Sequence, residues 1–188
     1  MQVNKAFMIV MLVFIIACNS AYCQAGDTLI TSGQFMGIKL EQTSFKEAAA
    51  ILNQFAYKAP KLNFRSIRWR DGGCSTLHMH HYFVKVKRSK LHVTLYGYGS
   101  VSRIQISAQG KTGLSYMGLR LGRSRIGEIQ FTGTGWERVT DVSGNSFLRN
   151  QFNGIRVDVA GDSVDVQKHN WPQQRINQIT LIGAGSER

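Results

Sequence analysis

The sequence predicts an α+β fold that is mainly antiparallel β-sheet and contains one short helix, over about residues 44–57. Two observations lead to this prediction. A helix-start signal is followed by apolar residues at helical spacing, and most of the remaining chain alternates apolar and polar residues in short runs. Turn-forming residues separate these runs, and strands joined by short turns pair with their neighbours in antiparallel order.

The helix is predicted from a capping box. Ser44 precedes Glu47 by three residues, so the serine side chain can accept the Glu47 amide while the glutamate reaches back to the serine amide. Apolar residues then share one helical face: Phe45, Ala48, Ala49, Leu52, Phe55 and Ala56. We expect the helix to end before Pro60, because proline lacks an amide donor and disfavours helical geometry in the residue before it.

Strands are predicted in both halves of the chain. In the first half they cover residues 62–70, 77–87, 91–98 and 101–108. In the second half they cover residues 130–131, 146–152, 154–159, 163–167 and 176–182. Asp158, Asp162 and Asp165 lie on a predicted hairpin, where we expect them to cap turns or offset nearby basic side chains.

A short motif occurs twice. Residues 36–40 (MGIKL) recur as residues 117–121 (MGLRL), and a serine and then a glutamate follow each copy. Such a repeat predicts two tandem α+β units, over residues 24–110 and 111–188, with chance similarity of short apolar motifs as the alternative.

Residues 1–23 have the layout of a secretory signal peptide. Lys5 supplies a positive charge, residues 7–16 form an unbroken apolar run, and residues 17–23 are mostly small or polar. The run is too short to span a bilayer. The sequence therefore predicts a secreted or periplasmic protein, which argues against intracellular nucleotide chemistry.

Two cleavage sites fit this leader. Residues 15–18 (IIAC) match a bacterial lipobox, in which Cys18 becomes the lipidated first residue of an outer-membrane lipoprotein. Ordinary signal-peptidase cleavage near Cys23 or Ala25 is the alternative. In the first case Cys23 and Cys74 could pair in an oxidising compartment, whereas cleavage after Cys23 leaves Cys74 as the remaining cysteine.

Positive charge is concentrated in one segment. The chain has 23 Lys and Arg against 11 Asp and Glu, a net charge of +12. Residues 58–103 contribute ten basic side chains against Asp71 alone, a net +9. A one-sided field speeds association with anionic partners. We therefore expect an acidic exported protein or an anionic envelope component as partner, with nucleic acid or anionic lipid as the alternative and solubility as the purely structural explanation.

Basic and aromatic residues are interleaved within this segment. Both types are enriched at the centres of interfaces, although alternation along a solvated sheet gives the same pattern. The predicted binding residues are Arg65, Arg68, Trp69, Arg70, Lys85, Lys87, Arg88 and Lys90.

Cys74 and residues 78–81 (HMHH) are the densest group of potential metal ligands. On a strand, His78 and His80 point the same way, so together with Cys74 they form a candidate zinc or copper site, with polar filling of a half-exposed sheet as the alternative. A secreted enzyme or toxin that uses Cys74 and residues 78–81, with His92 or His169 available as further partners, is the alternative to a binding protein. No phosphate-binding glycine loop, G-x-S-x-G or H-E-x-x-H occurs, so the sequence favours a protein without catalytic activity or a cofactor.

The repeated motif, the Ser-x-x-Glu helix start and the following meander resemble the β-lactamase-inhibitory-protein-like superfamily. Its members include small outer-membrane assembly lipoproteins and secreted inhibitors built from two tandem helix-plus-four-strand units. The resemblance covers residues 36–47 and 117–128, and it departs at Gly127, where the second helix is expected. It implies a tandem α+β fold and an inhibitor, immunity or envelope-interaction role, and no functional residues are carried over.

Overall fold

The computed structural model describes residues 30–184, except for residues 32, 69–71, 111, 117–118, 130–134, 141–145, 153–154 and 162–172. The predicted leader at residues 1–23, with Cys18 and Cys23, lies outside the described residues. The strands predicted at residues 130–131 and 163–167 lie outside them as well.

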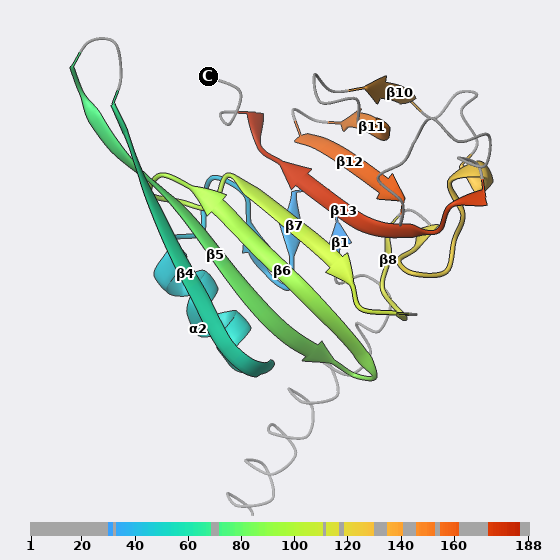
Figure 1. Ribbon diagram of the computed structural model, residues 1–188, viewed down its shortest axis with the longest axis horizontal. Helices are drawn as coiled ribbons and strands as arrows, with labels where there is room; N and C mark the ends of the chain where they lie inside the picture. The colour runs from blue at the N-terminus through green and yellow to red at the C-terminus, as the bar shows by residue number, and fades with distance from the viewer. Residues whose placement is uncertain are drawn as a thin grey trace, which may run out of the picture.

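An eight-stranded antiparallel sheet dominates the fold, with the strand order β10-β11-β12-β13-β7-β6-β5-β4 (Figure 1). Its strands are β4 (Ala56–Arg68), β5 (Cys74–Val86), β6 (Ser89–Gly97), β7 (Arg103–Ala108), β10 (Trp136–Thr140), β11 (Ser146–Phe152), β12 (Ile155–Gly161) and β13 (Ile176–Ile182). Strands β4 to β7 form one meander and β10 to β13 form another. The two meanders meet where β7 pairs with β13, so the sheet is continuous.

One face of the sheet is covered by a second layer. This layer contains α2 (Phe45–Asn53), β1 (Ile30–Thr31), β2 (Gln34–Phe35), β3 (Ile38–Lys39), β8 (Ser115–Tyr116), β9 (Leu119–Arg120) and the 3-10 helix η1 (Ile126–Glu128). In Figure 1, α2, β1 and β8 lie behind the sheet. Fully buried side chains from both layers meet between them, for example Phe35 and Leu52 from the second layer with Leu91 and Ile104 from the sheet. We call the opposite side of the sheet the polar face.

The capping box is confirmed. The Ser44 amide donates to Glu47 Oε2 at 2.9 Å, and the Glu47 amide donates to Ser44 Oγ at 3.3 Å. The predicted helix end is wrong, because α2 stops at Asn53 and Ala56 already belongs to β4. Pro60 fits within β4, because the pairing of β4 with β5 shifts register between Lys58 and Lys61. A missing amide donor is tolerated at such irregular positions of an edge strand.

The other strands follow the sequence pattern closely. β11 and β13 have the predicted bounds, and β4 to β7 and β12 overlap their predicted runs. β10 is not predicted, because its apolar residues Trp136 and Val139 are three positions apart and break the alternation.

The backbone around the repeated motif forms the same hydrogen bonds in both halves. The Lys39 amide donates to Thr43 Oγ1 at 2.9 Å, and the Arg120 amide donates to Ser124 Oγ at 3.1 Å. The carbonyls of Thr43 and Ser124 then accept the amides of Val101 and Ile176, at 2.9 and 2.8 Å. Each turn is thereby bonded to the last strand region of its meander. Val101 lies just before β7, and Ile176 is the first residue of β13.

The two halves differ in the helix that follows this turn. α2 has nine residues, whereas η1 has three. Ser44 caps α2 with its side chain, but the residue before η1 is Arg125, which makes no side-chain capping hydrogen bond. Gly127 also disfavours helix, so the departure expected in the second copy is present.

Candidate functional site

A row of polar residues crosses the polar face from one edge of the sheet to the other. Residues that are paired in register on neighbouring strands point to the same side. The row, which we call the polar row, consists of Lys61, His81, Thr94, Gln105, Thr180, Asp158, Arg149 and Glu137. Each of the eight strands contributes one member, so the polar face is a single surface shared by both meanders.

Lysines and rings gather on the polar face over β4, β5 and β6. This lysine–aromatic cluster consists of Tyr57, Lys58, Phe83, Lys85, Lys90 and His92. Lys58 Nζ lies 5.5 Å from the centre of the Phe83 ring and 5.8 Å from that of Tyr57. Lys90 Nζ lies 5.7 Å from the Tyr57 ring, and Phe83 stacks on His92 with ring centres 4.9 Å apart. The rings therefore hold ammonium groups by cation–π attraction.

The charge of this cluster is not neutralised within the described part of the chain. The ion pairs there both involve Asp158 on β12, and no described carboxylate lies within 4.0 Å of Lys58, Lys85 or Lys90. Lys85 and Lys90 are opposite each other in the register of β5 and β6, and like charges in that position repel. An anionic partner would relieve this repulsion.

Two histidines lie at the border between the cluster and the polar row. His81 Nδ1 is 3.2 Å from His92 Nε2 and 3.1 Å from Thr94 Oγ1. Burial lowers the pKa of both histidines, and the positive charge of Lys61 lowers both pKa values further. Both imidazoles are therefore neutral at pH 7, when one ring nitrogen of each donates and the other accepts.

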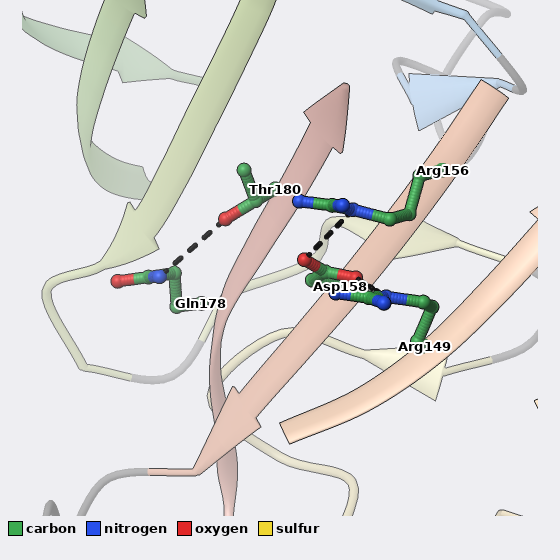
Figure 2. Close-up of polar contacts among 5 residues, drawn as sticks. All are labelled: Arg149, Arg156, Asp158, Gln178 and Thr180. Carbon is green, nitrogen blue, oxygen red and sulfur yellow. Dashed lines mark hydrogen bonds and ion pairs between the residues drawn. The ribbon is translucent and has the colours of Figure 1, made fainter. Parts of the chain in front are cut away.

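Amide side chains occupy the middle of the polar face, where the two meanders meet. The Tyr96 hydroxyl donates to Gln105 Oε1 at 3.3 Å, and Gln105 Nε2 donates to Gln178 Oε1 at 2.9 Å. Gln178 Nε2 then donates to Thr180 Oγ1 at 3.4 Å (Figure 2). This chain of hydrogen bonds runs from β6 through β7 to β13 and ties the meanders together.

A carboxylate between two arginines lies on the far side of this junction. Asp158 is 3.3 Å from Arg149 Nε and 3.2 Å from Arg156 Nε (Figure 2). Burial raises the pKa of Asp158, while the charges of Arg156 and Arg149 act in the opposite direction. Burial also lowers the pKa of Arg156, and Asp158 opposes that change. The predicted role of Asp158 in offsetting basic side chains is confirmed, whereas Asp162 and Asp165 lie outside the described residues.

Arg103 is a third arginine near this carboxylate. Arg103 and Arg156 both pair in register with Ile182, one from each side. The Arg103 guanidinium lies 5.5 Å from the Tyr96 ring, and its Nε is buried without a hydrogen-bond partner. A hollow of about 180 Å³ is lined by Arg149 and Arg156 together with Glu137, Gln151 and Ile182. This region therefore also carries a positive excess.

Two of the three predicted metal ligands lie together, since the ring centres of His78 and His80 are 5.4 Å apart, but Cys74 does not join them. His78 and His80 face the second layer, where both rings contact Phe45 with ring centres 4.9 and 4.7 Å away. Neither ring nitrogen of His80 has a hydrogen-bond partner, and burial lowers its pKa. Cys74 is exposed, six residues from His80 along an extended strand, which corresponds to about 20 Å. In the described ranges, no group of three or more His, Cys, Asp or Glu side chains could share a metal ion.

The structure does not bring together the residues of the catalytic alternative that it describes. His92 pairs with Phe83, nine positions along β5 from Cys74, so the two residues do not meet. His169 lies outside the described residues. His78 and His80 pack against Phe45, and His80 is buried, so they differ from the expected polar filling of a half-exposed sheet.

The predicted binding residues fall into two groups. Lys85, Lys87, Arg88 and Lys90 surround the turn between β5 and β6, and Arg65 and Arg68 lie at the opposite end of the β4–β5 hairpin. Trp69 and Arg70 lie outside the described residues. Sequence reasoning missed Tyr57, Lys58, Arg103, Arg149 and Arg156. The signal that could have found them is cross-strand register, which requires the strand order.

No helix in the described ranges combines the length and the apolar character needed to cross a membrane. Comparisons with protein-family models, with curated proteins and with solved structures found no match.

Proposed function

We propose that the protein is an exported, non-catalytic binding protein whose polar face engages an acidic partner. The observation that carries this proposal is the lysine–aromatic cluster, in which ammonium groups lie over rings and have no carboxylate partner among the described residues. The partner is an acidic exported protein, as for an inhibitor or immunity protein, or an anionic envelope component.

The geometry of the cluster suits such a partner. Lys58 and Lys90 are held over Tyr57 and Phe83, so less side-chain freedom is lost when they bind an anion. The rings add flat apolar area beside the charges, a combination typical of interface centres. The Tyr57 hydroxyl donates to Gln109 Oε1 at 2.9 Å, which fixes the ring.

Export is proposed from the layout of residues 1–23. If Cys18 is the first residue of the mature chain, the protein is a lipoprotein tethered to the membrane. If cleavage occurs near Cys23 or Ala25, it is free in the periplasm or medium. The mass of the mature protein distinguishes the two.

We also propose that the chain consists of two tandem units, over residues 24–110 and 111–188. The recurrence of the Lys39–Thr43 hydrogen bond as Arg120–Ser124 supports this proposal. So does the assembly of the sheet from two four-stranded meanders. The resemblance to the β-lactamase-inhibitory-protein-like superfamily implies the same arrangement.

Charge reversal on one face tests the proposed function. The variant Lys85→Glu/Lys90→Glu keeps a like-charge pair across β5 and β6, so its stability should stay close to that of the parent protein. The control Lys39→Glu/Lys46→Glu makes the same charge change at exposed residues of β3 and α2. Proteins captured from the native envelope are purified, and their affinity for each variant is measured.

We expect an acidic protein or envelope polymer to bind the parent and the control at least about tenfold more tightly than the Lys85→Glu/Lys90→Glu variant. Equal binding to all three would contradict the proposal. Tight binding of single-stranded DNA with a steep salt dependence would favour the nucleic-acid alternative instead.

A further inference from the structure

Another positively charged site lies at the end of the sheet where β13 begins, next to η1. Figure 1 shows the start of β13 beside the segment that contains η1. It is a hollow of about 380 Å³, and the described residues that line it are Gly122, Arg123, Arg125 and Arg175. The backbones of Arg125 and Arg175 form an antiparallel bridge, so their side chains start from adjacent positions. None of these residues belongs to the polar row or to the lysine–aromatic cluster, so the site is independent of the proposed function.

The three arginines are specific to the second half of the chain. The bridge between Arg125 and Arg175 has a counterpart between Ser44 and Ser100. The Arg123 amide donates to the Arg120 carbonyl in the same way that the Gln42 amide donates to the Lys39 carbonyl. The same backbone therefore carries Gln42, Ser44 and Ser100 in one half and Arg123, Arg125 and Arg175 in the other. Because neutral side chains satisfy this backbone, the fold does not require arginine here.

The arginines have no carboxylate partner among the described residues, where both ion pairs involve Asp158. The Arg125 guanidinium donates to the side-chain oxygen of Gln173, a neutral amide that fixes its position without neutralising its charge. Three like charges around one hollow repel one another unless an anion binds between them.

We propose that this hollow binds a phosphate group carried by a lipid head group or a soluble phosphate ester. Guanidinium forks bind phosphate oxygens through paired, charge-assisted hydrogen bonds. The oxygens of a tetrahedral phosphate point in several directions, so three arginines can contact one phosphate together, whereas a carboxylate offers two oxygens in one plane. A volume of about 380 Å³ accommodates a phosphate together with a small attached group.

Binding of glycerol 3-phosphate, measured by calorimetry at constant ionic strength, tests this proposal. The variant Arg123→Gln/Arg175→Ser installs the residues of the first half and leaves Arg125 bound to Gln173. The control Lys39→Gln/Lys46→Gln removes two charges from exposed positions elsewhere. We expect the first variant to lose about tenfold or more in affinity and the control to lose less than about twofold.

The variant Arg123→Lys/Arg175→Lys distinguishes a loss of binding from a folding defect. It keeps both positive charges but lacks the planar guanidinium forks. We expect its affinity to lie between those of the parent and the neutral variant. Vesicles of phosphatidylcholine with and without phosphatidylglycerol identify the source of the phosphate. Arginine-dependent binding to phosphatidylglycerol vesicles that glycerol 3-phosphate displaces identifies a lipid head group. Binding of glycerol 3-phosphate without vesicle binding identifies a soluble ester.

Three outcomes would overturn the proposal. The first is equal affinity of glycerol 3-phosphate for the parent and the Arg123→Gln/Arg175→Ser variant. The second is an equal loss in the Lys39→Gln/Lys46→Gln control, which would indicate a general charge effect. The third is that the parent binds neither glycerol 3-phosphate nor phosphatidylglycerol vesicles.

Discussion

Thr43 and Ser124 form the same hydrogen bond in the two halves of the chain, because each hydroxyl accepts the backbone amide four residues earlier, at 2.9 and 3.1 Å. Removing either acceptor leaves that amide without this partner. We expect Thr43→Val and Ser124→Ala each to lower the free energy of unfolding by about 1 kcal/mol, measured by urea denaturation. Thr43→Ser and Ser124→Thr should keep most of the stability. A loss at one site alone would argue against equivalent roles.

Gly97 lies at the end of β6, where the chain turns back closely on itself. A Cβ atom at this position would lie 2.0 Å from the Ser100 carbonyl oxygen and 3.1 Å from the Ser102 amide nitrogen. Because both obstacles are backbone atoms, we expect Gly97→Ala to lower the free energy of unfolding by about 2–3 kcal/mol. Gly99→Ala is the matched control, since its Cβ would meet nothing within 4 Å. Its effect should stay within about 0.5 kcal/mol, and equal effects of the two changes would contradict this account.

Asp158 offsets the positive charge of two arginines, which would otherwise repel each other on the polar face. We expect Asp158→Asn to lower the free energy of unfolding by about 2 kcal/mol, less than for a fully buried pair because these side chains keep partial exposure. Adding Arg149→Met should recover part of the loss. Glu137→Gln, at an exposed position on β10, should change stability by less than about 0.5 kcal/mol. If Asp158→Asn leaves the free energy of unfolding unchanged, solvent already screens the two arginines from each other.

One buried and two partly buried histidines predict a loss of stability on acidification. The pKa values of His80, His81 and His92 are lowered in the folded protein, so the unfolded chain binds more protons below its own histidine pKa of about 6.5. The free energy of unfolding should therefore fall as the pH drops from about 7 towards 5. His80→Leu should make this decline shallower, and the triple variant His80→Leu/His81→Gln/His92→Gln shallower still. Denaturation series at several pH values provide the measurement, and an unchanged slope in the triple variant would refute the assignment.

Local features of the fold could be predicted from the sequence. The Ser44–Glu47 capping box involves four consecutive residues, and β11 and β13 are short alternating runs bounded by turns. The start of β4 could not be predicted, because Ala56 continues the apolar spacing of the helix while its pairing with Val84 on β5 decides its structure. Tertiary pairing outweighs helix propensity there.

In the candidate site too, local neighbours could be predicted from the sequence, whereas neighbours brought together by strand order could not. Lys85 and Lys90 could be predicted as part of a basic surface, because they flank one turn between consecutive strands. Arg103 and Arg156 could not be placed near each other, because both reach Ile182 only through the pairing of β7 and β12 with β13. No local pattern encodes that strand order.

The pairing of β7 with β13 also sets the order in which the chain can mature. Gln105 and Gln178, which are hydrogen-bonded across this junction, are 73 residues apart. Until residues 176–182 have emerged and folded, the first meander lacks the strand that covers its edge. During that interval β7 presents unpaired backbone groups that can recruit another chain. Newly made protein therefore passes through a stage at which this open edge can aggregate, and pairing of β13 with β7 ends it.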